Sequence, residues 1–194
     1  MKRLLCVLAT AATLAIGSGT AQAQESENFF GNLFGSMFDG GGNSSGPIRR
    51  TTVDYGGQYE PGTIIVNTAE RRLYLTMANG QALRYGIGVG RDGFRWAGTH
   101  RVTAKKEWPT WTPPAQMLRR RPDLPRQMAG GIENPLGARA LYLGSTLYRI
   151  HGSNEPETIG QAVSSGCFRM TNDDVTDLYD RVRVGAKVVV INKK

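Results

Sequence analysis

Residues 72–89 read RLYLTMANGQALRYGIGV, and this stretch decides the fold. Two segments that suit β-strands, 72–77 and 81–89, flank the dipeptide Asn79-Gly80. Asn-Gly accepts positive φ in a tight hairpin turn, so strand, turn and strand together predict a β-hairpin. The chain therefore contains at least one clearly indicated antiparallel pair of strands.

Strand signals recur on both sides of this hairpin, at residues 63–66, 99–104, 140–143, 146–151 and 187–191. Helix signals are scarce. The clearest follows Thr171, whose hydroxyl can cap a helix with Asp174 three residues on, and apolar residues then recur at helical spacing until Gly185. The sequence predicts a mainly β fold, a closed or sandwiched sheet with one or two short helices packed against it.

A long proline-rich segment interrupts the strand pattern between residues 108 and 136. It also holds Trp108, Trp111 and the run Arg119-Arg120-Arg121. Irregular segments of this length inside a compact domain are usually functional or disordered. Two interpretations stay open: an ordered flap over a groove, with arginines that meet carboxylates, or a surface loop whose tryptophans fill the core.

The first 23 residues have the pattern of a secretory signal peptide, with Lys2 and Arg3, an apolar run over 4–16, and Ala21-Gln22-Ala23 at the cleavage site. Residues 24–58 are rich in glycine, serine and asparagine, and we expect a disordered tether there. Residues 59–194 remain for one domain with its own core. No later segment approaches the ~20 apolar residues of a membrane helix, so we expect an exported protein that is not transmembrane.

The mature chain is expected to stay basic, because removing residues 1–23 lowers the formal net charge only from +8 to +6. A positive field concentrates anionic polymers such as cell-wall peptides or acidic polysaccharide. No basic helix or aromatic-basic RNA motif is present, so nucleic acid is not an expected partner. The two histidines, His100 and His151, and one remaining cysteine make a poor zinc set, so we expect no metal.

The glycine pattern Gly88-Val89-Gly90-Arg91-Asp92-Gly93 is similar to a dinucleotide-binding motif and follows a strand. No helix is expected after it and a parallel βαβ unit is missing, so we attribute the match to chance. The glycines are better explained by a bend or by close approach of two backbones. The sequence therefore predicts no nucleotide site and no cofactor.

Cys167 is the candidate nucleophile, because Cys6 lies in the segment expected to be removed and leaves Cys167 without a disulfide partner. A thiol needs a base or a lowered pKa to attack at neutral pH, and His151, sixteen positions earlier, is the nearby residue that titrates there. Gly166 permits a tight turn, so amide N–H groups beside the cysteine are able to face a developing oxyanion. The alternative is an inert cysteine beside a core histidine.

Two segments that hold these residues, 151–153 (HGS) and 164–170 (SSGCFRM), resemble the signature of the L,D-transpeptidases with a YkuD-type catalytic domain. Other stretches resemble that domain in the same order, at residues 63–66, 73–74, 85–90, 108–114, 134–141, 172–175 and 178–179. The resemblance covers residues 60–192 and leaves the inert-cysteine interpretation a minor one. It implies a YkuD-type β domain with a long Trp- and Pro-rich flap.

The resemblance also implies a function: a periplasmic transferase of peptidoglycan biosynthesis that contributes to cell-wall organisation and cell shape. Cys167 would attack the carbonyl of the third residue of a tetrapeptide stem, expel D-Ala, and pass the acyl group to a second stem as a 3→3 cross-link. His151 would be the base, oriented by the carbonyl of Gly152. The amides of Gly166 and Cys167 would form the oxyanion hole.

Three further residues are expected to bind substrate: Arg169, Ser165 and Trp111. Arg169 either holds a substrate carboxylate or braces its loop. Ser165 stands where many family members carry a second histidine, and we expect activity to survive because His151 is the expected base. Trp111 belongs to the expected flap.

The acceptor of the acyl group stays open in the sequence. Water in place of an amine gives an L,D-carboxypeptidase, and a protein amine gives attachment of an outer-membrane protein to peptidoglycan. Outside this chemistry, the positive charge and the Trp- and Arg-rich segment also suit a non-catalytic wall-binding module. A general thiol protease is a weaker alternative.

Overall fold

The computed structural model describes residues 48–193, which belong to one compact unit. The expected signal peptide and tether residues 24–47 lie outside the described residues. In chain order the elements are β1 Thr51–Asp54, β2 Ile64–Asn67, β3 Arg72–Thr76, β4 Gln81–Gly86, β5 Val89–Gly90, β6 Gly98–Glu107, α2 Ala115–Arg120, β7 Arg139–Leu143, β8 Arg149–His151, η1 Pro156–Thr158, β9 Ala162–Ser164, β10 Phe168–Arg169, α3 Asn172–Arg181 and β11 Lys187–Ile191.

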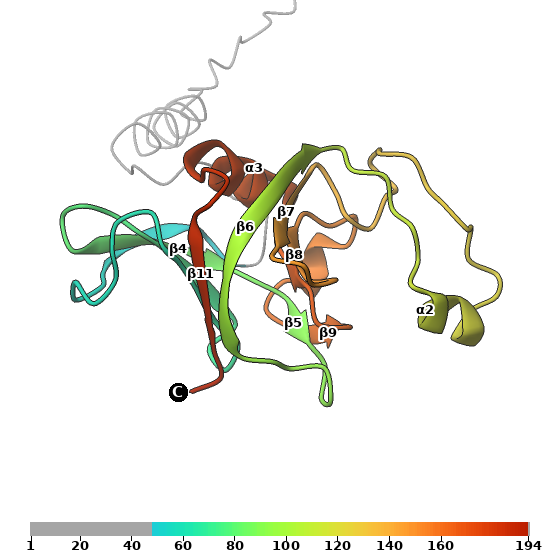
Figure 1. Cartoon of the computed structure of the whole chain (residues 1–194), viewed down its shortest axis with the longest axis horizontal. Coiled ribbons are helices and arrows are strands. Elements are labelled where there is room, and N and C mark those ends of the chain that lie inside the picture. The colour runs from blue at the N-terminus through green and yellow to red at the C-terminus, as the bar shows by residue number, and fades with distance from the viewer. Residues whose placement is uncertain (1–47, 194) are drawn as a thin grey trace, which may run out of the picture. The chain divides into compact units, whose positions relative to one another are not determined.

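A nine-stranded sheet forms the body of the domain, in the order β1-β4-β3-β2-β11-β6-β7-β8-β10 (Figure 1). The predicted hairpin is the antiparallel pair β3–β4, with Gly80 at a φ of 74° in its turn. Strand β11 pairs parallel with β2 and antiparallel with β6, so the end of the chain joins the hairpin to the later strands. A bridge between Gly88 and Arg169 links β10, the edge strand of the sheet, to the segment that follows β4. The sheet therefore curls toward closure.

Helix α3 covers the core at one end of this curled sheet, in contact with β7 and β8 (Figure 1). It begins as predicted, because Thr171 Oγ1 accepts a hydrogen bond of 3.1 Å from the Asp174 N–H. Its apolar side is buried through Val175 and Leu178. The predicted mainly β fold with short helices is thus confirmed. Within residues 48–193 no helix is long and apolar enough to span a membrane.

The tether boundary predicted at residue 58 is wrong, because strand β1 lies inside the predicted tether. Its β-branched residues pair antiparallel with β4, from Thr51 opposite Arg84 to Asp54 opposite Gln81. The preceding Arg50 reaches α3, with Nη1 3.0 Å from Asp177 Oδ2. Without β1 the edge of β4 would expose unpaired backbone groups, so the ordered domain begins before residue 51.

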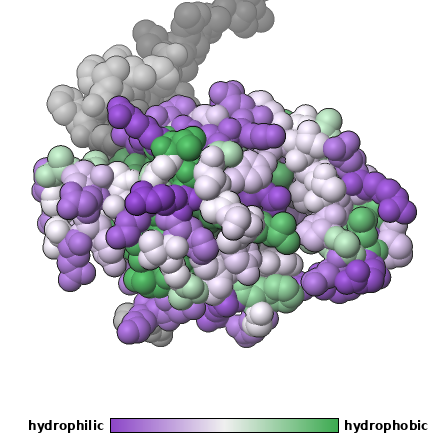
Figure 2. Space-filling model, in the orientation of Figure 1, coloured by the Kyte–Doolittle hydropathy of each residue, from purple (hydrophilic) through white to green (hydrophobic). Residues whose placement is uncertain are grey.

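The segment 108–136 contains more order than its prolines suggest. It includes α2 and an antiparallel bridge between Trp111 and Met128, and its Asn134 amide donates to three backbone carbonyls at 2.9–3.2 Å. Trp108 is 43% exposed and Trp111 is half-buried outside the core cluster, so the interpretation in which these tryptophans fill the core is wrong. Figure 2 shows hydrophilic residues on the outer side of the α2 region, with hydrophobic residues among them.

Candidate active site

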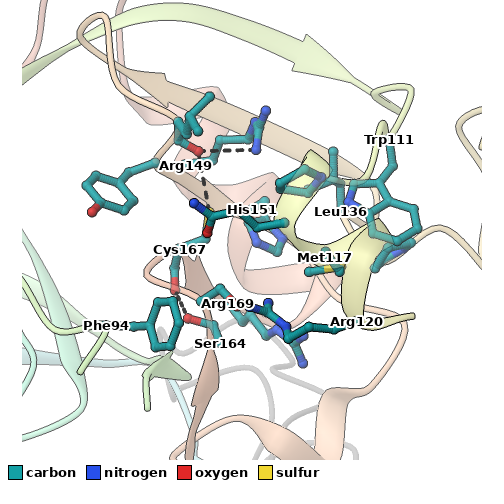
Figure 3. Close-up of a pocket in the computed structure, with 16 residues that line it drawn as sticks. Phe94, Trp111, Met117, Arg120, Leu136, Arg149, His151, Ser164, Cys167 and Arg169 are labelled. Carbon is teal, nitrogen blue, oxygen red and sulfur yellow. Dashed lines mark hydrogen bonds between the residues drawn. The ribbon is translucent and has the colours of Figure 1, made fainter. Parts of the chain in front are cut away.

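The parallel pairing of β8 with β10 brings the two signature segments together. Arg169 lies opposite His151 and Phe168 opposite Ile150. Side chains alternate along a strand, so His151 and Arg149 share one face with Arg169 and with Cys167, which immediately precedes β10. All four line one pocket of about 410 Å³ (Figure 3). The expected base, at the end of β8, and the expected nucleophile, immediately before β10, therefore line the same pocket.

The His151 imidazole is held by the backbone of the next residue. Its Nδ1 lies 2.6 Å from the Gly152 carbonyl oxygen, and a carbonyl only accepts, so Nδ1 carries the proton and Nε2 keeps its lone pair. Gly152 itself is packed tightly, because a Cβ there would lie 2.3 Å from Asn172 Oδ1 at the start of α3. This Asn172 oxygen accepts the Ala138 N–H at 2.9 Å, which fixes the helix to the strand that carries the base.

Burial sets the protonation state of both groups. It lowers the pKa of His151 from 6.5 to about 4; the Gly152 hydrogen bond acts in the opposite sense, and the charges of Arg169 and Arg149 lower the pKa further. Burial also raises the pKa of the Cys167 thiol, against the opposing effects of the same two arginines. At neutral pH the resting site thus holds a neutral imidazole and a neutral thiol, an arrangement suited to general-base removal of the thiol proton during attack.

The loop before the nucleophile is held by Ser164, which belongs to the signature segment 164–170 but was not predicted as a site residue. Its hydroxyl donates to the Cys167 carbonyl at 2.6 Å and accepts the Gly166 N–H at 3.2 Å. Gly166 has a φ of 112°, and a Cβ there would lie 2.6 Å from the Tyr148 ring, so only glycine fits. Serine hydroxyls commonly bond to backbone groups a few residues away, and this is the signal by which Ser164 could have been selected.

The expected substrate-binding side chains of Arg169, Ser165 and Trp111 all line the pocket, and their roles stay predictions. Arg169 also pairs with Glu155 at 2.8 Å, which supports the bracing role. Gly152 and Gly166 are not among the lining residues, and their expected roles belong to backbone atoms. Arg120, one of the arginines of the flap interpretation, also lines the pocket. The lining includes further side chains that the sequence analysis did not select: Phe94, Gln116, Met117, Leu136, Leu147, Tyr148 and Arg149.

Comparison with known proteins shows the family of this domain. The YkuD family, described as the L,D-transpeptidase catalytic domain, matches residues 61–190. The chain belongs to the YkuD family. A probable L,D-transpeptidase of Escherichia coli (strain K12), ErfK/SrfK, is 40% identical over 139 residues, which are 67% of this chain and 44% of that protein. The chain thus spans less than half the length of this relative.

Two solved structures are also similar. A Brucella melitensis protein, described as a probable carnitine operon oxidoreductase caia, is 46% identical, with a TM-score of 0.51, and the match covers 75% of this chain and 94% of that one. The catalytic domain of an E. faecium L,D-transpeptidase acylated by ertapenem has a TM-score of 0.53 at 21% identity, over 70% of this chain and 100% of that one. The second likeness concerns the fold alone.

In this YkuD domain the glycines of residues 88–93 allow backbone segments to approach closely, and they do not belong to a βαβ unit. Strand β5 follows β4 directly and pairs with β9, and the chain continues into β6 without a helix. A Cβ on Gly90 would lie 2.5 Å from the Phe94 carbonyl oxygen, and one on Gly88 would lie 3.2 Å from that of Thr158. The predicted close backbone approach is confirmed. Within residues 48–193 no group of three or more His, Cys, Asp or Glu side chains is arranged to hold a metal ion.

Proposed function

We propose that this chain is an exported peptidoglycan L,D-transpeptidase with Cys167 as its nucleophile. One observation carries the proposal: the Gly152 carbonyl holds the His151 imidazole with Nε2 unprotonated, in the pocket that also exposes the thiol. This arrangement provides a base and a nucleophile, and it needs no acidic residue to orient the base. The signal-peptide pattern of residues 1–23 supports action in the periplasm.

The proposed acylation conserves atoms and charge. Cys167 Sγ forms a bond to the carbonyl carbon of the third stem residue, its proton moves to His151 Nε2, and the carbonyl oxygen becomes an oxyanion. Collapse of this intermediate breaks the amide bond, and the imidazolium returns the proton to the departing D-Ala amine. An amine of a second stem then attacks the thioester, which yields the 3→3 cross-link and restores the thiol.

The charge of the pocket supports an anionic peptide as acyl donor. Among the described residues, 48–193, the charged side chains in its lining are Arg120, Arg149 and Arg169, and none is Asp or Glu. A tetrapeptide stem brings the terminal carboxylate of D-Ala and a further carboxylate on diaminopimelate, and guanidinium groups pair well with carboxylates. Glu155 already pairs with Arg169, which leaves Arg120 and Arg149 as the candidate partners of the donor.

The acceptor is set by the shape of the groove beyond the thioester. We propose a second stem amine, the acceptor of the commonest reaction that the resemblance implies. Water would make the protein an L,D-carboxypeptidase, and a protein amine would make it an enzyme that attaches an outer-membrane protein to the wall. All three reactions pass through the same thioester on Cys167.

Mass spectrometry of the purified protein with a tetrapeptide-stem muropeptide tests the proposal. We expect a thioester on Cys167, release of D-Ala and a cross-linked dimer. Cys167→Ala is expected to form no adduct, and His151→Gln, which keeps the thiol, is expected to acylate at least about a hundredfold more slowly. If D-Ala release continues in Cys167→Ala, the mechanism is wrong. If the wild type neither forms an adduct nor releases D-Ala while it still binds peptidoglycan, the wall-binding module is the better function.

A further inference from the structure

We propose that Trp96 is a positioning residue that directs the Cys167 N–H toward the oxyanion. It does so by holding the carbonyl oxygen at the other side of the same peptide group. The inference rests on the proposed acylation of Cys167, and it adds a residue that lies outside both signature segments.

One hydrogen bond carries the inference. The indole Nε1–H of Trp96 donates to the Gly166 carbonyl oxygen at 2.8 Å. This carbonyl and the Cys167 N–H belong to one planar trans peptide group, in which C=O and N–H point in opposite directions. Trp96 does not line the pocket, whereas Cys167 does. An oxygen held on the Trp96 side therefore turns the N–H away from the indole, toward the side where the thiol and its substrate meet.

The indole is itself held firmly in place. It stacks on Tyr148 with ring centroids 4.4 Å apart and an interplanar angle of 12°, and it packs at 5.3 Å from the buried Phe168 ring. The His100 and Trp96 rings are nearly perpendicular, at 84°, with their centroids 5.2 Å apart. Tyr148 also fills the space beside Gly166, where a Cβ would lie 2.6 Å from its ring. The aromatic cluster Trp96–Tyr148–Phe168 thus packs against the Gly166–Cys167 peptide; Tyr148 also lines the pocket, whereas Trp96 and Phe168 do not.

The Cys167 N–H is also the more available donor of the two amides. The Gly166 N–H donates to Ser164 Oγ at 3.2 Å, whereas within residues 48–193 no acceptor takes the Cys167 N–H. A hydrogen bond to the carbonyl of a peptide group polarises it and strengthens its N–H as a donor. Trp96 therefore both orients and strengthens this amide before substrate arrives, which is the requirement for electrostatic stabilisation of an oxyanion.

Two reactions of the same thiol separate this role from a general structural one. In acylation by ertapenem, Sγ bonds to the lactam carbonyl carbon, the lactam C–N bond breaks, the thiol proton ends on the lactam nitrogen, and an oxyanion forms on the way. In alkylation by iodoacetamide, Sγ displaces iodide from a methylene carbon and the thiol proton goes to solvent. No carbonyl oxygen gains charge in the alkylation, so it does not use an oxyanion hole.

Trp96→Phe keeps an aromatic ring in the stack and removes the N–H donor. We expect it to slow acylation by ertapenem about tenfold, less than the ~10²–10³-fold that loss of an oxyanion donor itself costs, and to leave the alkylation rate within about twofold. Trp108→Phe is the matched control, because this indole is 43% exposed and does not line the pocket. We expect it to change neither rate.

The outcomes are distinct. A parallel fall of both rates in Trp96→Phe, or no fall in acylation, overturns the inference while the proposed function stands. A wild-type thiol that is alkylated but not acylated by ertapenem or by a stem peptide counts against the proposed function itself. If Trp96→Phe does not fold, benzothienylalanine at position 96 replaces only the N–H by sulfur, and the same contrast between the two rates is expected.

Discussion

A neutral resting His151 is the property on which the proposed chemistry depends most directly, and lowering the pH tests it. Burial lowers the pKa of this imidazole from 6.5 to about 4 in the folded protein. At ~1.4 kcal/mol per pH unit, this difference corresponds to about 3 kcal/mol of unfolding free energy. In the unfolded chain His151 takes up a proton as the pH falls through about 6.5, whereas the folded chain keeps it neutral to about 4. The stabilisation is therefore full above pH 6.5 and is lost as the pH falls toward 4.

Two measurements check this sign and size. The chain has two histidines, so the Cε1–H signals of His151 and His100 can both be followed by NMR titration, and the His151 signal is expected to titrate far below 6.5. Urea unfolding is then measured for the wild type and for His151→Gln, whose side chain stays neutral throughout. As the pH falls from about 6.5 to 4.5, we expect the unfolding free energy of the wild type to decrease by about 2–3 kcal/mol more than that of the variant.

The same pKa governs the acylation rate. Because the base must be neutral to accept the thiol proton, we expect the acid limb of Cys167 acylation to follow the His151 pKa, well below 6.5. An imidazole that titrates near 6.5, together with equal pH dependence of the two unfolding free energies, would refute the lowered pKa of His151 and its control of the acid limb.

The remaining predictions concern stability. Tyr85→Phe removes the 2.6 Å hydrogen bond to Asp177 and should cost about 2 kcal/mol in urea unfolding; a loss below about 0.5 kcal/mol would contradict it. The unfolding free energy of a chain of residues 48–194 should exceed that of a chain of residues 59–194 by at least about 2 kcal/mol, because the shorter chain lacks β1. Equal urea midpoints would show that β1 adds no stability. Cys167→Ala should keep the thermal midpoint within about 2 °C, since the thiol is half-buried and its bond to a carbonyl, at 3.8 Å, is weak.

Local signals in the sequence predicted much of the fold and part of the site. The turn at Asn79-Gly80 and the cap at Thr171 depend on residues within a few positions of each other, and both lie where the pattern placed them. The apolar run 187–191 coincides with β11. Cys167 and His151 were selected because thiol and imidazole are distinctive chemical groups, and the parallel pairing of β10 with β8 brings them into one pocket.

The features that the sequence did not predict depend on contacts between distant segments or carry weak local signals. Strand β1 was assigned to the tether because four residues after a Gly- and Ser-rich run carry a weak signal, and they become ordered only by pairing with β4. Helix α2 has no capping side chain and no buried residue, so the sequence gives little sign of it. Arg149 was overlooked because an arginine in a strand is ordinary until the neighbouring strand places a cysteine beside it.

The amino-acid order alone specified the class of fold, the hairpin, the capped helix and the identity of the reactive atoms, because each depends on neighbours along the chain or on intrinsic chemistry. Tertiary structure decided the protonation of His151, the pocket's cationic lining and the contact of Trp96 with Gly166, which lie 70 positions apart. These properties arise from burial and from contacts between distant segments. They exist only once the curled sheet has excluded water and brought those segments together.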